Sequence, residues 1–98
     1  MAKLRLELYV VGQSLKSLSA VENVRRICAA RAVGGYDLRV IDVVEQPGLA
    51  EAANIVATPT LVKLAPPPTR RIIGDLSATD AVMQALGIEP HDSERESK

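Results

Sequence analysis

The stretch Ala57-Thr58-Pro59-Thr60-Leu61 decides the arrangement of the second half of the chain. It places an X-Pro pair directly ahead of the aliphatic run at residues 61–64, which is typical of a buried strand. Proline offers no N–H to a sheet, and it restricts the residue before it to extended backbone. The pattern therefore predicts a loop that is shaped by Pro59 and leads straight into a strand.

Ahead of this stretch, the hydrophobic periodicity predicts a strand, a helix and a second strand. Apolar and polar side chains alternate over residues 4–10, which is typical of a strand. Over residues 17–32 the apolar positions recur every three or four residues, which indicates an amphipathic helix. Ser19 and Glu22 match a capping box near its start. Residues 38–44 are rich in β-branched side chains, so the three elements predict a parallel βαβ unit.

After the Thr-Pro stretch, the sequence predicts a hairpin. The run Pro66-Pro67-Pro68 cannot continue a ladder of hydrogen bonds, so it is expected to form a turn or a sheet edge. It separates the strand at residues 61–64 from a brief strand at residues 71–73. We expect Arg70 and Arg71 to be a solvated end of this hairpin rather than an anion site.

Two further helices are predicted, and they complete a single domain. Pro47 suits the first position of a short helix that runs to residue 55. Ser77 is expected to cap the last helix at its start, and Gly87 to cap it at its end. Residues 1–88 show no break in composition and are expected to form one domain. Residues 89–98 are polar and lack periodicity, which predicts a disordered tail.

The predicted order is β-α-β-α-β-β-α, which is the order of a thioredoxin-like α/β domain with a mixed four-stranded sheet. That fold places a cis-proline ahead of its third strand, where this chain has Pro59. Its sheet order is 2-1-3-4, so the strand at residues 37–44 is expected to lie at an edge. A free apolar edge invites a partner to add a strand through main-chain hydrogen bonds.

Composition and charge exclude several classes of partner. The 12 basic residues balance 12 acidic ones, so the chain lacks the electrostatic footprint that nucleic acid or an anionic membrane requires. No apolar run approaches the roughly 20 residues that span a bilayer. The single cysteine, Cys28, fits a reducing compartment. We expect a cytoplasmic protein that binds neither nucleic acid nor membrane.

The residue types that catalysis requires are scarce. A thiol oxidoreductase of this architecture needs a low-pKa cysteine at the start of the first helix, where this chain has Gly12-Gln13-Ser14-Leu15. Cys28 lies on the apolar stripe of the helix and is expected to be a buried small hydrophobe. One cysteine and one histidine cannot form a four-ligand zinc site, so no metal or cofactor is expected. Ala57-Thr58-Pro59 and Ser77 superficially match a glutathione transferase half-domain, which leaves an enzyme as one alternative.

Several motifs at fixed spacing resemble the KaiB family of circadian clock proteins. They are Val40-Ile41-Asp42-Val43, Pro47-x-Leu49-Ala50-Glu51, Ala57-Thr58-Pro59-Thr60-Leu61, Pro66-Pro67-Pro68 and Arg71-Ile72-Ile73-Gly74-Asp75-Leu76-Ser77. The match covers roughly residues 4–86, nearly without gaps. Their joint occurrence is far more specific than any one of them. A related sensor domain forms the N-terminus of the histidine kinase SasA.

The resemblance implies a non-catalytic protein that binds a KaiC-type ATPase and regulates its phosphorylation cycle. KaiA and kinases of the SasA and CikA type are further partners that it implies. By the same resemblance the contact surface involves the second strand and the second helix. Its partner-binding residues are then Arg39, Leu49, Asn54 and Ile55. The alternative is a thioredoxin-like sensor module of a histidine kinase.

The resemblance also implies a metamorphic protein that switches between two folds. One is a homotetramer of order β-α-β-β-α-α-β, and the other is the thioredoxin-like monomer that binds KaiC. The family carries Gly and Asp where this chain has Ala85 and Gly87, and Ala85 favours a helix by roughly 0.5–1 kcal/mol. We therefore expect the monomer to be favoured. Pro59 and the run Pro66-Pro67-Pro68 are expected to slow the exchange if their isomers differ between the forms.

Overall fold

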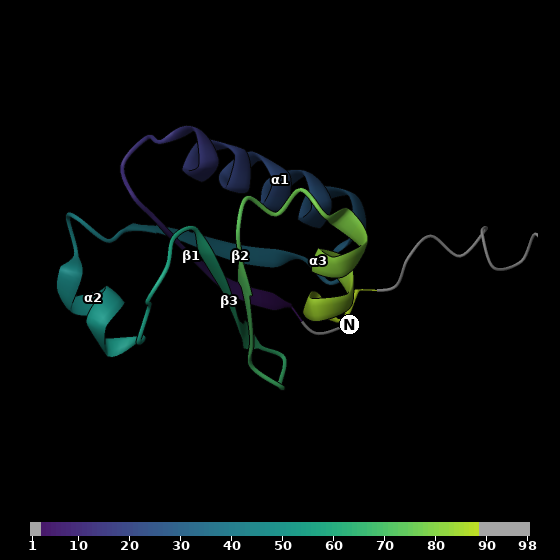
Figure 1. The fold of residues 1–98 in the computed structure, drawn as a ribbon. Helices are drawn as coiled ribbons and strands as arrows, with labels where there is room; N and C mark the ends of the chain where they lie inside the picture. Colours follow the sequence, from purple (N-terminus) through teal and green to yellow (C-terminus); the bar gives the residue numbers. More distant parts are fainter. Residues whose placement is uncertain (1–2, 89–98) are drawn as a thin grey trace, which may run out of the picture.

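In the computed structural model, which describes residues 3–88, a mixed four-stranded sheet of order β2-β1-β3-β4 lies at the centre (Figure 1). β1 pairs parallel with β2 and antiparallel with β3, and β3 pairs antiparallel with β4. This arrangement confirms the predicted thioredoxin-like order and the edge position of β2. The elements are β1 (Leu4–Val10), α1 (Leu15–Arg31), β2 (Tyr36–Asp42), α2 (Pro47–Ala52), β3 (Thr60–Ala65), β4 (Arg70–Ile73) and α3 (Thr79–Leu86). The predicted tail at residues 89–98 lies outside the described residues.

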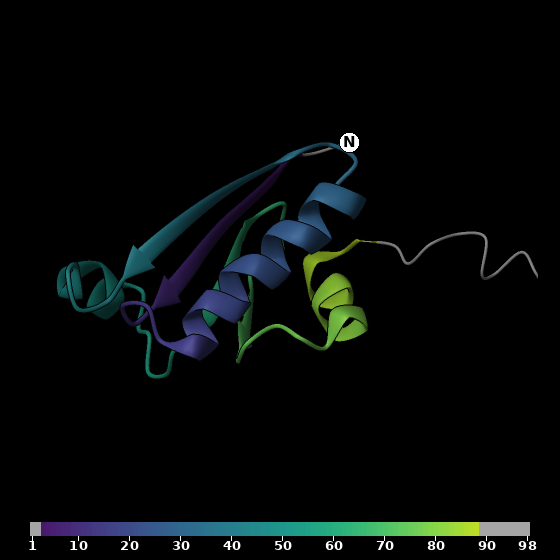
Figure 2. The ribbon, with the colours of Figure 1, turned by 90° about the horizontal axis from the view of Figure 1, so that it is seen from above.

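The helices cover the two faces of the sheet unequally. α1 and α3 cover one face, and α2 lies at one end of the molecule (Figures 1 and 2). Since side chains alternate along a strand, β1 contributes to both faces. The larger hydrophobic cluster joins the sheet to α1 and α3, and it includes Leu8, Val24 and Val82. The smaller cluster joins the opposite face to α2, and its buried residues are Tyr9, Ile41 and Val62.

The start of α1 differs from the prediction, because serines other than the expected one fix it. Ser14 is the N-cap, and its Oγ accepts the Ser17 N–H at 3.2 Å. Ser17 is buried, and its own Oγ accepts the Val11 N–H at 3.1 Å. The predicted capping box of Ser19 and Glu22 is therefore wrong. The earlier serine pair satisfies the free N–H groups where the chain leaves β1, so the helix begins before the predicted box.

The start of α3 also differs from the prediction. Ser77 does not cap this helix, because α3 begins later and its N-cap, Ala78, makes no side-chain capping bond. The carboxylate of Asp75 accepts the Ser77 N–H at 3.0 Å instead, which forms a local turn. Between them, Leu76 is buried with a left-handed φ of 64°. A local Asp turn has displaced the helix start along the chain.

Within residues 3–88, three peptide bonds that precede prolines are cis. Thr58–Pro59 lies immediately ahead of β3, which confirms the predicted cis-proline. Ala65–Pro66 and Pro67–Pro68 lie in the turn between β3 and β4, where the run of prolines was expected. The Pro59 carbonyl accepts the Gly74 N–H at 2.9 Å, so the loop ahead of β3 is tied to the residue that follows β4.

Gly87 ends α3 as predicted, and Ala85 lies half-buried within the last turn of the helix. Gly87 has a φ of 76° in the left-handed region, and its N–H donates to the Gln84 carbonyl at 3.2 Å. A Cβ at this position would lie 3.8 Å from Lys63 Nζ, which is an ordinary contact. The preference for glycine is therefore a matter of backbone conformation and not of space.

We expect Gly87→Ala to lower the free energy of unfolding by about 1–2 kcal/mol, because an L-residue is disfavoured at a left-handed φ. Gly48→Ala is the matched control. Gly48 lies in α2 without a left-handed φ and with open space around its Cβ position, so alanine should raise the stability by up to about 1 kcal/mol. Urea unfolding of both variants measures these changes in stability. Equal effects of the same sign would contradict the role of Gly87 as the C-cap of α3.

Candidate functional site

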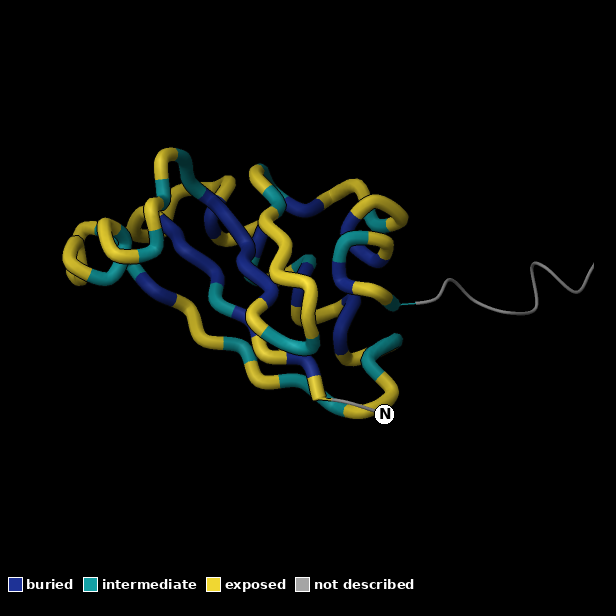
Figure 3. The backbone as a smooth tube through the Cα atoms, turned by 90° about the horizontal axis from the view of Figure 1, so that it is seen from below, coloured by how far each residue is buried: buried dark blue, intermediate teal, exposed yellow. Residues whose placement is uncertain are grey.

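β2 forms one edge of the sheet and is the least buried of its long strands. It pairs only with β1, so its outer main-chain groups have no strand partner among residues 3–88. Only Ile41 of this strand is buried. Figure 3 shows the burial of each residue along the backbone. Asp37, Arg39 and Val40 are exposed, and Val40 retains 38% of its accessible surface. The edge is therefore accessible to an added strand.

Arg39 belongs to a small polar cluster on the sheet face that α2 covers at one end. Its Nη1 lies 3.9 Å from Glu7 Oε2, and Glu7 Oε1 accepts the Tyr9 hydroxyl at 2.8 Å. Burial is the largest cause and the hydrogen bond to Glu7 is the next, and together they raise the pKa of Tyr9 to about 12. Tyr9 is therefore a neutral donor at physiological pH. Because Arg39 is exposed, its ion pair contributes little to stability and leaves the guanidinium available to a partner.

Leu49 and Ile55 serve both the core and the surface. α2 has no fully buried residue, and it is attached to the sheet by half-buried side chains. Leu49 and Ile55 both pack against the smaller cluster, together with Ala50 and Ala53. Both side chains therefore contribute to the core, and each keeps an exposed part on the surface. Any partner that covers α2 would meet the exposed part of each side chain.

Asn54 marks the point at which the chain leaves α2. The helix was predicted to reach Ile55, but it ends at Ala52, because Asn54 has a left-handed φ of 60°. The Asn54 side chain is exposed, whereas the Ile55 N–H returns to the Ala50 carbonyl at 2.9 Å. Asn tolerates this conformation better than most L-residues, so it fixes a turn at the C-terminal end of α2.

Arg71 holds this turn in place, and sequence reasoning missed it. Its Nη1 donates to the Asn54 carbonyl at 3.2 Å, and its Nη2 donates to the Ala53 carbonyl. Arg71 is exposed, as expected for a solvated hairpin end, but its guanidinium also contacts the end of α2. A cation suits the carbonyls at a helix C-terminus, but the contact depends on the pairing of β4 with β3. No local pattern in the sequence could have indicated it.

The four predicted partner-binding residues lie on the same side of the sheet. Leu49 and Ile55 share the smaller cluster, which contains Tyr9. Arg39 is linked to Tyr9 through Glu7, and the Asn54 carbonyl is held by a side chain from β4. We call this surface, formed by β2 and residues 47–55, the α2 face.

The loop between β1 and α1 carries main-chain bonds where a thiol enzyme would hold its cysteine. Asp42 Oδ2 accepts the Gly12 N–H at 3.1 Å, and its Oδ1 accepts the Val44 N–H at 2.8 Å. Cys28 lies elsewhere, buried within α1, and burial raises the pKa of its thiol to about 11. The reactive thiolate is therefore disfavoured at neutral pH. Within residues 3–88 there is no metal-binding group of three acidic, His or Cys side chains and no helix that could span a membrane.

The family model described as the KaiB domain matches residues 7–88. The chain belongs to the KaiB family. This confirms the resemblance that the motifs indicated. The circadian clock protein KaiB3 of Synechocystis sp. is 46% identical to this KaiB-family chain over 90 residues, which cover 92% of the chain and 88% of KaiB3.

Solved structures place the KaiB-family chain within the thioredoxin-like fold. The N-terminal domain of SasA from Synechococcus elongatus superimposes with a TM-score of 0.71 and is 34% identical, covering 86% of this chain and 81% of that domain. Chloroplastic thioredoxin z also superimposes with a TM-score of 0.71, covering 87% of this chain and 76% of the thioredoxin, and its 23% identity shows the fold alone.

We expect Arg71→Met to increase amide exchange at Asn54 and Ile55 about tenfold, which corresponds to about 1.4 kcal/mol. The methionine keeps an apolar stem but removes the charged donors, whose hydrogen bonds contribute about 1.5–3 kcal/mol when well formed. Arg70→Met is the control, since this exposed neighbour on the same strand points to the other face. Equal exchange at these amides in both variants would show that Arg71 does not hold the turn.

Proposed function

We propose that this KaiB-family chain is a non-catalytic clock component that binds a KaiC-type ATPase through the α2 face. The observation that carries the proposal is that Arg39, Leu49, Asn54 and Ile55 lie on one side of a sheet whose nearest edge is free. Family membership supports a role in a circadian clock. In this proposal the domain acts by occupying a site on the ATPase, and it thereby regulates the phosphorylation cycle of that enzyme.

The α2 face offers two kinds of contact. The outer edge of β2 can form main-chain hydrogen bonds with a strand of the partner, which supply affinity independently of sequence. The half-buried side chains of Leu49 and Ile55 and the guanidinium of Arg39 can supply specificity. Arg residues at the centre of an interface contribute strongly because they combine charge with apolar surface. A partner with an acidic group opposite Arg39 fits this surface best.

The chemistry of the chain supports a binding role over a thiol or glutathione enzyme. The start of α1 carries Ser14 and Ser17 where a redox enzyme needs a low-pKa cysteine. Ser17 Oγ accepts a hydrogen bond from the Val11 N–H, and Ser14 Oγ accepts one from the Ser17 N–H. Cys28 is buried, with a raised pKa. None of these groups is placed as an activated nucleophile.

We further propose that the thioredoxin-like monomer is the binding-competent form and that a homotetramer of the second fold is its alternative. Ala85 and Gly87 support this form, because one lies within α3 and the other caps it. Pro59 and the run Pro66-Pro67-Pro68 lie in the half of the chain that would refold. KaiA and kinases of the SasA or CikA type are the further partners that fit a domain of this family.

A sensor module of a histidine kinase is the second candidate function. The similarity to the SasA N-terminal domain favours it, since 34% identity accompanies the shared fold. The two functions differ in what binds. A clock component binds the ATPase as a separate protein, whereas a sensor module also associates with the kinase that it controls. Parallel binding assays with a KaiC homologue and a SasA-type kinase separate them.

We expect Arg39→Ala to weaken binding to a KaiC homologue, measured by fluorescence anisotropy in the presence of ATP, about tenfold or about 1.4 kcal/mol. Arg70→Ala is the control, because Arg70 is equally exposed but lies on the strand at the opposite edge. Both variants should keep the urea midpoint of the parent, since exposed ion pairs contribute about 1 kcal/mol at most. Equal weakening by both substitutions would place the contact elsewhere. No association of the parent with the homologue would refute the clock role.

A further inference from the structure

An apolar cavity of about 220 Å³ opens where β1 and β2 end, beside α2 and the loop ahead of β3. Every residue that lines it is uncharged, and Thr58 is the only one with a polar side chain. The others include Val11, Val43, Ala50 and Val56. The four segments that form it meet at the same end of the molecule (Figures 1 and 2). Such a cavity accepts an apolar side chain and rejects a charged one.

The rim of the cavity carries exposed valines. Val56 retains 87% of its accessible surface, and Val44, which follows a lining residue, retains 70%. Val11 retains 39%. Single exposed valines need no explanation, but several around one apolar cavity form a patch of the kind that partners cover.

The main chain beside this cavity is unpaired. The ladder between β1 and β3 ends with Tyr9 opposite Thr60, and beyond it Val11 and Thr58 line the same cavity. The ladder stops before this pair, because the Val11 N–H donates to Ser17 Oγ at 3.1 Å and its carbonyl accepts the Ser14 N–H at 3.3 Å. Within residues 3–88, the main-chain groups of Thr58 take part in no hydrogen bond, and neither do those of Val56. The sheet thus ends in free donors and acceptors beside an apolar cavity.

We propose that this end of the sheet binds an extended segment of a partner protein. The segment pairs with the main chain of Val56 and Thr58 and places an uncharged apolar side chain in the cavity. This inference rests on the proposed function, because Ala50 and Ile55 belong both to the cavity and to the α2 face. It adds a second contact, distinct from the β2 edge, and states the chemistry of the partner segment.

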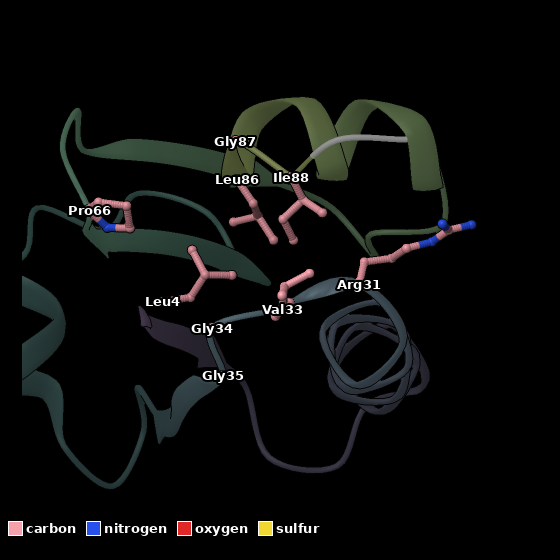
Figure 4. A pocket seen from close by; sticks show the side chains of 10 residues that line it. Leu4, Arg31, Val33, Gly34, Gly35, Pro66, Leu86, Gly87 and Ile88 are labelled. Atoms are coloured by element: carbon pink, nitrogen blue, oxygen red, sulfur yellow. The ribbon is translucent and has the colours of Figure 1, made fainter. Parts of the chain in front are cut away.

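The cavity at the other end of the molecule lacks this combination. It measures about 160 Å³ and is lined by Arg31 as well as by apolar residues that include Leu4, Val33 and Leu86 (Figure 4). The Leu4 main chain beside it is paired, since the Leu4 N–H donates to the Gly35 carbonyl at 3.0 Å. A cavity whose lining includes a cation is less selective for an uncharged side chain than one whose lining is wholly uncharged.

The test is an NMR titration of the full chain with acetyl-Lys-Thr-Leu-Thr-Lys-amide and with the same peptide carrying Asp in place of Leu. We expect the leucine peptide to shift the amide signals of residues 56–58 and the aspartate peptide to leave them unchanged. Val56→Asp should weaken binding of the leucine peptide at least tenfold. Val33→Asp, which changes a valine of 83% exposure at the opposite end, should have no effect.

Three results would overturn the inference: no shift at residues 56–58, equal shifts with both peptides, or equal effects of Val56→Asp and Val33→Asp. Anisotropy with the KaiC homologue separates this failure from that of the proposed function. If the leucine peptide binds and the ATPase does not, the proposed function fails and the cavity site stands. If the ATPase binds the parent and Val56→Asp equally and the peptide does not bind, the cavity site alone fails.

Discussion

The antiparallel pairing of β1 with β3 is the constraint on which the rest of the structure depends. It joins residues far apart in the sequence, with Leu8 opposite Leu61 and Tyr9 opposite Thr60. This pairing places β1 between β2 and β3, so both edges of β1 are hydrogen-bonded. It thereby leaves β2 at the edge and sets the register of the hairpin that carries Arg71.

The two surfaces that we assign to partners follow from this pairing. Because β3 takes the inner side of β1, the βαβ unit exposes the outer edge of β2. Because β4 follows β3 in register, Arg71 reaches the carbonyls at the end of α2 and holds the turn at Asn54. Because the ladder stops at Tyr9, Thr58 keeps free main-chain groups. A rigid sheet therefore presents both a strand edge and a short, weakly packed helix, which is a common design for binding surfaces.

The sequence predicted those features that depend on local chemistry. The order of the elements follows from hydrophobic period, the loop ahead of β3 from Pro59, and the end of α3 from Gly87. The prediction failed where two local signals competed, since Asp75 forms a turn that takes the N–H of the expected cap, Ser77. The contact of Arg71 with the end of α2 was not predicted, because it joins β4 to α2 and requires the register of the sheet. The residues of the candidate site were predicted from the family resemblance. Their arrangement on one face of the sheet could be seen only in the folded structure.

The central claim is that the free chain holds the thioredoxin-like form, in which the α2 face exists. Assigned backbone chemical shifts of the free protein, recorded together with its sedimentation, test this claim most directly. The account predicts a monomer with helical shifts over Thr79–Leu86 and strand shifts over Thr60–Ala65. A tetramer with strand shifts near residues 85–88 would contradict it.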